Sequence, residues 1–507
     1  MSTVPTTYTE LLSAVDAGAR APRAVPVHDP ATEELIGYAP QLDEDDLDRV
    51  VATARQAQRE WSARSEADRC ELLVAAAEAI ERATEPLAEL LSREQGKPLN
   101  GPNARFEVGG CSAWTRATAG FELGEEVVVD DGQTRATLTY RPIGVVGAIS
   151  PWNWPMMISI WQIAPSLRMG NTVVIKPSEH TPLSVLALVY VLNSVLPEGV
   201  LQVVPGGPQL GAAISRHEGI DKIMFTGSTA TGRKIVEASA PTLKRLTMEL
   251  GGNDAGIVLE DADPEAIAEG LFWGAFINTG QTCAALKRLY VPDALYEPVC
   301  RALTEFARSQ PMGIGLEEQN VLGPLQNSAQ YDVVDRLVRA AVEDGARVLL
   351  GGNPDAERPG FFYPTTLVAD IDPENPLVVQ EQFGPALPII RYSDLEWAIE
   401  QANALDVGLG ASVWSSDPAR AREVAARIEA GTVWINGHGG IDPRIPFGGI
   451  KSSGFGVEFG RRGSEARGCS PGHQRLRPPD HSRGRVEAPL GDRGITGERT
   501  GRWRPST

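Results

Sequence analysis

The sequence has few of the residues that hold domains together through cross-links or metal ions. Its 507 residues include five cysteines, none of them in a CxxC pair, and six histidines with neither HxxxH nor HExxH spacing. So few scattered cysteines exclude a disulfide framework and favour a reducing, cytoplasmic compartment. The histidine spacing lacks the common zinc motifs, and we therefore expect no metal site.

The sequence also shows neither the pattern of a secretory signal nor an apolar run long enough to span a membrane. The first residues, MSTVPTTYTELLSAVDAG, contain neither the basic nor the apolar part of a secretory signal, so we expect no such signal. The longest apolar run, LSVLALVYVLNSVL, lies between Pro182 and Pro197 and is too short to span a bilayer, which predicts a buried helix. The net charge of -19 argues against nucleic acid and anionic membranes as partners.

Charge is unevenly spread along the chain. From Arg461 onward, eleven arginines stand against five acidic residues, a net charge of +6, whereas the preceding chain carries -25. Arg, Gly, Pro and Ser dominate this tail, and its large apolar side chains are isolated. Such a segment cannot bury enough apolar surface to fold, so we expect residues 461–507 to form an aberrant, disordered tail.

The pattern of apolar residues predicts an α/β fold. Helical periodicity covers residues 43–95, and from Val145 onward apolar strands alternate with helices, with a second such series after Gly251. This alternation favours parallel sheets that bind ligands at the carboxyl ends of their strands. The stretch EEVVVDDGQTRATLTYRPIG alternates polar and apolar residues and turns at Asp131 and Gly132, which predicts a hairpin.

One cysteine, Cys283, lies between small residues in FINTGQTCAAL. A free cysteine of this kind is most often a small, packed core residue. The alternative is a nucleophile, and a nucleophile needs partners from other parts of the chain.

Two motifs offer such partners. In SPWNWP, two prolines restrain the backbone around Asn153, so its amide can serve as an oxyanion donor; the alternative is that Asn153 caps its own turn. In MELGGND, Glu249 ends an apolar strand. If it is partly buried, its pKa would rise and it could act as a general base; a structural ion pair is the alternative.

Two further motifs have features of a nucleotide site. GSTATG, from Gly227 to Gly232, follows a strand and opens a helix whose free N–H groups favour phosphate. An ordinary helix capped by Ser228 or Thr229 fits the same pattern. Lys176 and Glu179 follow a strand and can hold the hydroxyls of a ribose, although a solvated strand end explains them equally well.

In order and spacing, these motifs resemble those of the aldehyde dehydrogenase superfamily. The resemblance covers Ala31 to Gly460 and includes SPWNWP, IKPSEHTP, FTGSTATGRKI, MELGGND, GQTCAALKR, QEQFGPALPI and PFGGIKSSGFG. It implies homodimers or homotetramers. The implied parts are a Rossmann-like NAD-binding domain (1–124 and 143–251), a β-hairpin for oligomerisation (125–142) and an α/β catalytic domain (252–460).

The resemblance implies a role for each motif. Cys283 matches the nucleophile, Asn153 the oxyanion-hole donor, and Glu249 the acid that activates the deacylating water; Glu458 matches a proton relay of some relatives. Trp154, Trp161 and Phe447 match the walls of the aldehyde channel. The residues that match coenzyme contacts are Ile149, Ser150, Pro151, Trp152, Lys176, Ser178, Glu179, Gly227, Ser228, Thr231, Gly232, Gly251, Glu381 and Phe383.

The implied reaction is oxidation of an aldehyde to a carboxylic acid with NAD(P)+, through a thiohemiacetal and a thioester on Cys283. Glu179 would repel a 2′-phosphate, which favours NAD, whereas Lys176 and Ser178 are compatible with NADP. Gly280 and the alanines at 284 and 285 then provide clearance beside the sulfur. Two alternatives stay open: a catalytically impaired NAD-binding relative with a defective C-terminus, and a thioester hydrolase that uses no dinucleotide.

The sequence departs from the family after GFGVEFG. Relatives usually continue into an acidic, apolar segment that ends in a strand joining the neighbouring subunit. Here the sequence continues as RRGSEARGCSPGHQRLRPPDHSRGRVEAPLGDRG, which indicates either a shifted reading frame or a divergent tail. In both cases strand pairing with a partner subunit is weakened, since Pro and Gly cannot supply a regular ladder.

Overall fold

The structure, a computed structural model, describes residues 4–465, 468–469 and 472–476. The chain divides into two compact units, and each is described by itself. The larger one comprises Met1–Leu123 and Tyr140–Ser470, and the smaller one Gly124–Thr139 and Pro471–Thr507. Within the part of the chain that is described, no helix is both long enough and apolar enough to cross a membrane.

The first sheet of the larger unit has six strands in the order β20-β10-β9-β6-β7-β8. All neighbouring pairs are parallel except that of β20, which runs antiparallel to β10. Every residue of β6, β7 and β9 is buried, as expected for central strands covered on both faces. The strands are β6 (Val145–Ile149), β7 (Thr172–Lys176), β8 (Leu201–Val203), β9 (Lys222–Thr226), β10 (Arg245–Glu249) and β20 (Gly454–Phe455).

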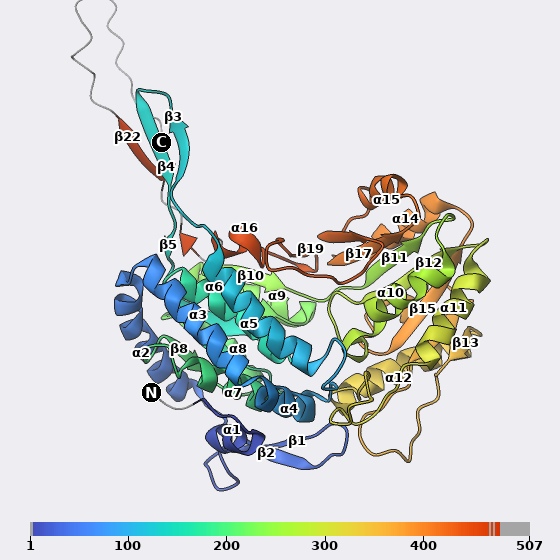
Figure 1. Ribbon diagram of the computed structural model, residues 1–507, viewed down its shortest axis with the longest axis horizontal. Helices are drawn as coiled ribbons and strands as arrows, with labels where there is room; N and C mark the ends of the chain where they lie inside the picture. The colour runs from blue at the N-terminus through green and yellow to red at the C-terminus, as the bar shows by residue number, and fades with distance from the viewer. Residues whose placement is uncertain (1–3, 466–467, 470–471, 477–507) are drawn as a thin grey trace, which may run out of the picture. The chain divides into compact units, whose positions relative to one another are not determined.

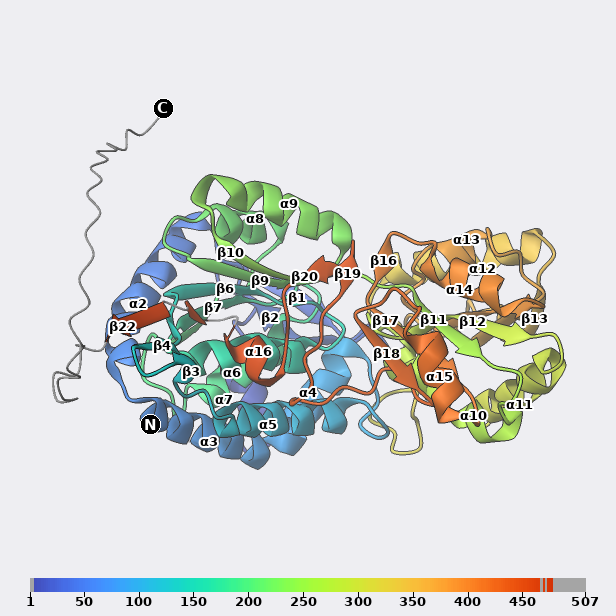
Figure 2. The same cartoon turned by 90° about the horizontal axis from the view of Figure 1, so that it is seen from above.

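Helices cover both faces of this sheet. The helices are α2 (Glu44–Ala63), α3 (Glu66–Arg82), α4 (Thr84–Gln95), α5 (Ala104–Gly120), α6 (Pro155–Arg168), α7 (Pro182–Leu192), α8 (Pro208–Arg216) and α9 (Thr229–Ser239), followed by the short η1 (Ala240–Thr242). Figure 2 shows α8 and α9 on one side of the sheet and α3, α5 and α6 on the other. The predicted buried helix in the longest apolar run is confirmed as α7.

The second sheet has seven strands in the order β13-β14-β15-β12-β11-β17-β18. Helices α10 and α11 pack on one face, and α12 and α14 on the other (Figure 2). The strands are β11 (Asp254–Val258), β12 (Leu286–Pro292), β13 (Arg347–Leu350), β14 (Thr366–Ala369), β15 (Ala386–Tyr392), β17 (Gly410–Trp414) and β18 (Thr432–Ile435). The helices are α10 (Pro264–Phe276), η2 (Ile277–Gly280), α11 (Tyr296–Arg308), α12 (Ser328–Glu343), α13 (Pro376–Val379), α14 (Leu395–Asn403) and α15 (Pro418–Ala425).

The C-terminal segment of the larger unit returns from the second sheet to the first. After β18 it forms β19 (Ile450–Lys451), which pairs with β16 (Val407–Gly408), and then β20 at the edge of the first sheet. This red segment runs from one sheet to the other in Figure 1. The sequence PFGGIKSSGFG lies in this segment. Through β19 and β20 it pairs both with β16, which precedes β17 of the second sheet, and with β10 of the first sheet.

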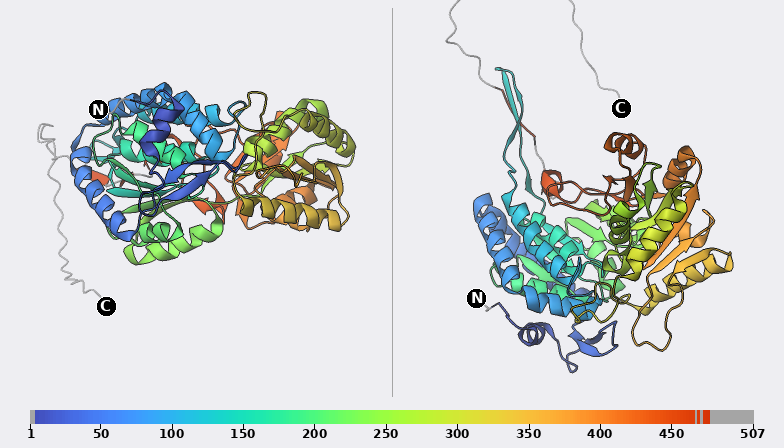
Figure 3. Two further views of the ribbon diagram at one scale, coloured as in Figure 1. Left: turned by 90° about the horizontal axis from the view of Figure 1, so that it is seen from below. Right: turned by 45° about the vertical axis from the view of Figure 1, so that its right-hand side comes forward.

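The N-terminal segment packs against helices of the first sheet. It forms α1 (Tyr8–Val15) and a hairpin of β1 (Val25–His28) and β2 (Leu35–Ala39), seen in dark blue in Figure 3. Leu11 of α1 is fully buried in the same hydrophobic cluster as residues of α4 and α7. The β1–β2 hairpin also contacts the chain that precedes β14 of the second sheet, because the Phe361 N–H donates to the Pro30 carbonyl oxygen at 2.9 Å.

The smaller unit contains the predicted hairpin, which is confirmed. Strands β3 (Glu126–Asp130) and β4 (Thr134–Leu138) pair antiparallel, and Gly132 in the turn has a φ of 88°. The unit ends at Thr139 rather than at residue 142, because β5 (Arg141–Pro142) pairs with β21 (Gly468–Cys469) within the larger unit.

The expectation of a disordered tail from residue 461 is wrong for its first part. There, α16 (Gly460–Glu465) and β21 form, and β22 (Gly472–Leu476) pairs antiparallel with β4. A ladder uses backbone N–H and C=O groups, and β22 contains no proline and only one glycine, so its composition does not prevent pairing. The rest of the predicted tail, residues 466–467, 470–471 and 477–507, lies outside the described residues.

Candidate active site

A cavity of about 630 Å³ lies at the carboxyl ends of the strands of the first sheet. Ile149 and Lys176 end β6 and β7, Thr226 ends β9, and Leu250 follows β10; all four line the cavity. This is the edge at which parallel α/β sheets bind ligands. The position therefore agrees with the sequence-based expectation for a ligand site.

Nearly all predicted coenzyme residues surround this cavity. Those that line it are Ile149, Ser150, Pro151, Trp152, Lys176, Ser178, Glu179, Gly227, Ser228, Thr231, Gly251, Glu381 and Phe383. The exception is Gly232, which faces Leu250: a Cβ added at Gly232 would come within 2.6 Å of a Leu250 methyl group. Close packing of α9 on the chain after β10 explains a glycine at this position, and the coenzyme contact of Gly232 stays a prediction.

The polar groups of the cavity suit a nucleotide. Ser228 is the N-cap of α9 and accepts a hydrogen bond from the Thr231 N–H. It also lines the cavity, so the predicted capping role does not exclude a role in the site. Lys176 is buried rather than solvated, and its burial lowers the pKa to about 8, which Glu179 opposes. Among the described residues, the buried Ser150 hydroxyl has no hydrogen-bond partner, so a bound ligand can satisfy it.

The sequence reasoning did not identify the wall formed by α8. Pro208, Gly211, Ala212 and Ser215 all line the cavity. A sequence signal existed, since GGPQLGAAIS places small residues one turn apart on a single helix face. Small side chains on α8 widen the space between α8 and α9, and a flat ring fits such a space.

A strained turn leads into Cys283. Asn278, Thr279 and Gly280 are consecutive left-handed residues, with φ values of 50°, 56° and 76°. A Cβ at Gly280 would come within 2.3 Å of the Gly384 carbonyl oxygen. Gly280 is therefore required by the close approach of Gly384, and the expectation that it provides clearance for a ligand is wrong.

Cys283 itself is half-buried and lines the cavity. Burial raises the pKa of its thiol to about 12, an effect that the Lys287 ammonium partly offsets and that the carboxylates of Asp254, Glu381 and Glu249 reinforce. The thiol is therefore protonated at neutral pH in the free protein. Nucleophilic attack requires that a base take this proton.

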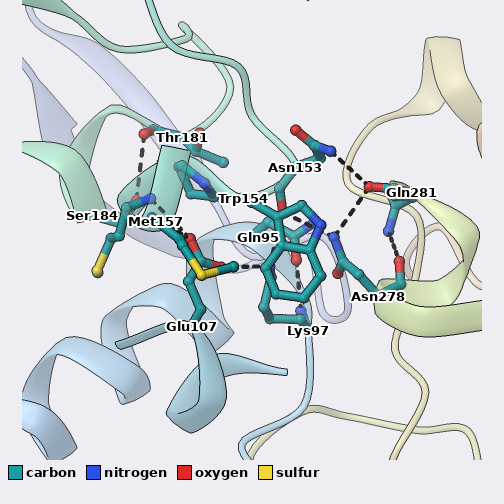
Figure 4. A network of polar contacts seen from close by, with 12 residues as sticks. Gln95, Lys97, Glu107, Asn153, Trp154, Met157, Thr181, Ser184, Asn278 and Gln281 are labelled. Atoms are coloured by element: carbon teal, nitrogen blue, oxygen red, sulfur yellow. Dashed lines mark hydrogen bonds and ion pairs between the residues drawn. The ribbon is translucent and has the colours of Figure 1, made fainter. Parts of the chain in front are cut away.

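Asn153 lies beside the Cys283 turn. Its side-chain Nδ2 donates to the Gln281 carbonyl oxygen at 2.9 Å, so the amide does not cap its own turn (Figure 4). An amide carries two N–H bonds, and this contact uses one. The next residue, Trp154, donates from Nε1 to the Thr282 hydroxyl at 2.9 Å, so both side chains contact the segment that precedes Cys283.

Glu249 and Glu381, two of the predicted acidic residues, lie in different places relative to the cavity. Glu249 is buried at the end of β10, outside the cavity wall, and its charge acts on the Cys283 thiol. Glu381 lines the cavity with 28% of its side chain exposed and lies 3.2 Å from Lys287. Burial raises the pKa of Glu381, and the Lys287 ammonium lowers it in part.

Two of the three predicted channel residues, Trp161 and Phe447, belong to an aromatic cluster outside the cavity wall. Trp161 and Phe447 both contact Phe459, with ring centroids 4.6 Å and 6.1 Å apart, and Trp114 lies 5.6 Å from the same ring. Trp154 is not part of this set; its ring packs on Phe106. Cys283 packs against the hydrophobic cluster that contains these aromatic residues. Phe459 and Trp114 were not predicted, because isolated aromatic residues give no sequence signal.

Glu458 is buried next to this aromatic cluster. Its backbone exchanges two hydrogen bonds with Phe447, at 3.0 Å and 2.8 Å. Glu458 therefore forms an isolated antiparallel β-bridge with a predicted channel residue. Across the described residues, no group of three or more His, Cys, Asp or Glu side chains could hold a metal ion.

Comparisons with known proteins identify the family. Residues 17–467 match the model of the aldehyde dehydrogenase family. Aldehyde dehydrogenase LUC3 of Fusarium sp. is 39% identical over 86% of this chain and 92% of its own, and the phenylacetaldehyde dehydrogenase of Pseudomonas fluorescens is 38% identical over 87% and 90%.

The fold leads to the same family. An NAD+ complex of an aldehyde dehydrogenase from Bacillus cereus has a TM-score of 0.85 and 35% identity, covering 89% of this chain and 93% of that chain. Sequence, fold and a cavity suited to a nucleotide agree. The chain belongs to the aldehyde dehydrogenase family and is an NAD(P)-dependent enzyme that oxidises aldehydes.

Proposed function

We propose that the enzyme oxidises an aldehyde to a carboxylic acid by forming a thiohemiacetal and then a thioester on Cys283. The observation that carries the proposal is that Cys283 and Asn153 line the same cavity as the residues expected to hold the coenzyme. A thiol and an amide donor at one end of a nucleotide-sized cavity suit a reaction between a covalently held substrate and a dinucleotide.

In this proposal the coenzyme lies along the whole cavity. Lys176 and Glu179 bind the adenosine ribose, the small residues of α8 and α9 admit the adenine ring, and the N-terminus of α9 faces the pyrophosphate. Glu381 and Phe383 hold the nicotinamide ribose and ring near Cys283. When bound, the nicotinamide supplies the hydride acceptor that converts the thiohemiacetal into a thioester.

Cys283 and Asn153 carry the first step. The Cys283 thiol gives its proton to solvent, the sulfur bonds to the aldehyde carbon, and the carbonyl oxygen becomes negative. The Asn153 amide and a backbone N–H donate to this oxygen, and one such donor stabilises the transition state by about 3 kcal/mol. The contact between Asn153 and Gln281 supports this role, because it holds the amide beside the Cys283 turn.

Glu249 is the proposed base for the second step. It takes a proton from water, the hydroxide adds to the thioester carbon, and the carbon–sulfur bond breaks to release the acid and the Cys283 sulfur. The position of Glu249 supports this role, because it is buried at the end of β10 and its charge acts on the Cys283 thiol. Glu458 is proposed as a proton relay from its buried place beside Phe447.

The aromatic cluster suggests the substrate class. Trp161, Phe447 and Phe459 present rings to the hydrophobic cluster against which Cys283 packs. We therefore propose apolar aldehydes, aromatic or long-chain, with Trp154 also facing the channel. The phenylacetaldehyde dehydrogenase relative fits this class.

NAD is the proposed coenzyme in preference to NADP. Glu179 is exposed at the cavity rim, where its negative charge would repel a 2′-phosphate. Lys176 and Ser178 lie close by and are compatible with NADP, so the preference rests on Glu179.

Residues 1–124 and 143–251 are the proposed coenzyme domain, and 252–460 the catalytic domain.

The β3–β4 hairpin is proposed as the element for assembly into a homodimer or homotetramer, because Val127, Val128 and Val129 on β3 are 47%, 61% and 39% exposed. Light scattering tests the assembly, and a monomer would contradict it. Cys70, Cys111, Cys283 and Cys300 are free, which supports a cytoplasmic location; fractionation of the source cells tests it.

Incubation with NAD+ and a panel of aldehydes tests the reaction as a whole. Absorbance at 340 nm follows the NADH, and product analysis follows the acid. The proposal predicts one carboxylic acid for each NADH, with aromatic or long-chain aldehydes preferred over acetaldehyde. NADH formation without free acid would contradict the hydrolytic step.

A further inference from the structure

A buried ion pair lies outside the cavity wall and has no part in the steps described above. Lys97, in the loop after α4, and Glu107, on α5, have fully buried side chains, and Lys97 Nζ lies 2.6 Å from a Glu107 oxygen. Charged side chains are rarely buried to this extent, because both ions lose their hydration. Packing alone does not require a charge at either position, so the contacts of the pair deserve a functional explanation.

Both members of the pair bind the SPWNWP turn. Lys97 Nζ donates to the Asn153 carbonyl oxygen at 2.8 Å and lies 3.7 Å from the centre of the Trp154 ring (Figure 4). The second oxygen of Glu107 accepts from the N–H groups of Met156 and Met157, at 2.9 Å and 3.1 Å. The cation therefore holds the end of the turn, and the anion holds the start of α6.

The local sequence explains why α6 depends on Glu107. The N-cap of α6 is Trp154, whose side chain cannot accept a hydrogen bond from the first turn, and Pro155 has no N–H. The first free donors are those of Met156 and Met157, which Glu107 binds from another helix. A tryptophan at the cap can instead reach across to Thr282.

The turn transmits this restraint to the residues before Cys283. Asn153 Nδ2 and Trp154 Nε1 donate to Gln281 and Thr282, each at 2.9 Å. Asn278 returns a hydrogen bond to the Asn153 carbonyl oxygen at 2.9 Å, so this oxygen accepts from Lys97 and Asn278 together. Figure 4 shows the contacts among Asn153, Asn278, Gln281 and Lys97 as one connected network.

We propose that Lys97 and Glu107 are positioning residues that fix the Asn153 amide relative to the Cys283 sulfur. The inference rests on the proposed role of Asn153 as oxyanion donor. Neither charge touches the cavity; the pair acts through the backbone of Asn153 and the ring of Trp154. A misplacement of about 1 Å at a reacting group can lower the rate about 100-fold, which is the scale of effect expected here.

The first experiment separates positioning from stability. In Lys97→Met combined with Glu107→Gln, both charges are gone and the glutamine still accepts from the α6 N–H groups, so the melting temperature should stay near that of the wild type. The rate of the first NADH formed per site in stopped flow should still fall about 10- to 100-fold, with the Kd for NAD+ unchanged. A wild-type rate in this double variant would overturn the proposal.

The second experiment asks whether the pair acts through Asn153. Lys97→Met is combined with Asn153→Ala, and the first-turnover rate is measured for both single variants and the double variant. We expect Lys97→Met to lower the rate strongly in the wild-type chain and less than about threefold in the Asn153→Ala chain. Full additivity would overturn the inference while leaving the role of Asn153 intact, whereas an unaffected Asn153→Ala chain would contradict the proposed function itself.

The chain provides a matched control on the same helix. Arg116, also on α5, forms a bidentate pair with Glu81, but these side chains are 40% and 45% exposed. Arg116→Met should leave the first-turnover rate within about twofold of the wild type, because exposed pairs contribute little. An equal loss of rate in Arg116→Met and Lys97→Met would indicate a general effect of α5 and would contradict the positioning role.

Discussion

Lys287 donates a hydrogen bond to the carbonyl oxygen of Cys283 at 2.5 Å and lies 3.2 Å from the carboxylate of Glu381. One buried ammonium thus connects the proposed nucleophile with the proposed ligand of the nicotinamide ribose. Among the charges around Cys283, that of Lys287 lowers the pKa of the thiol, whereas those of Asp254, Glu381 and Glu249 raise it. We therefore expect the reactivity of Cys283 to depend on this lysine.

Replacing Lys287 should make Cys283 less reactive. Lys287→Met removes the charge that favours the thiolate, so alkylation of Cys283 by iodoacetamide at pH 9 should slow about three- to tenfold. Mass spectrometry of the labelled peptide measures the rate. Lys244→Met is the control, since Lys244 contacts the His217 carbonyl oxygen instead. Faster alkylation in Lys287→Met would contradict this electrostatic account.

The pH dependence of alkylation follows from the raised pKa of Cys283. With a thiol pKa of about 12, the protonated form dominates at neutral pH, and the thiolate fraction grows about tenfold for each pH unit below that value. In the free enzyme, the alkylation rate should rise without a plateau from pH 7 to pH 10. A plateau near pH 8 would show that another group lowers the pKa of the thiol.

Glu249→Gln should separate the two halves of the reaction. The amide cannot take a proton from water, so steady-state turnover should fall about 100- to 1,000-fold. The proposal assigns Glu249 to the second step alone, so a burst of about one NADH per site should remain in stopped flow. The exposed Glu260→Gln serves as the control. A variant without a burst would place Glu249 in the first step instead.

Coenzyme preference should depend on Glu179. Glu179→Ser removes the charge that opposes a 2′-phosphate, so kcat/KM with NADP+ should rise at least about tenfold relative to that with NAD+. The Lys176 ammonium favours the 2′-phosphate only while it is charged, and with a pKa of about 8 this contribution should fade above pH 8. Glu237→Ser, on the exposed face of α9, should leave the ratio unchanged. Parallel kinetics with both coenzymes measure the ratio.

Much of the site could be predicted because its residues follow strands or fill short motifs. Lys176 and Glu249 end apolar strands, and GSTATG opens a helix, so their positions at one edge of a sheet follow from the βαβ pattern. Cys283 and Asn153 lie 130 residues apart, and it was the order of the motifs, not their local sequence, that brought them together.

Other features depend on contacts that no local pattern encodes. In the sequence, Lys97 and Glu107 resemble ordinary surface charges, and only folding buries them together. Gly280 is explained by Gly384, and the position of Phe459 by rings from two other segments. The strand β22 was not expected, because the composition of the tail gave no indication that its backbone would pair with β4.

The central claim is that aldehyde oxidation proceeds through Cys283. The most direct test measures NADH at 340 nm and free carboxylic acid together, for the wild-type chain and for Cys283→Ala, with a saturating aromatic aldehyde and NAD+. We expect the wild type to form both products in equal amounts and Cys283→Ala to form neither, while binding NAD+ with an unchanged Kd. Full steady-state activity in Cys283→Ala would contradict the account.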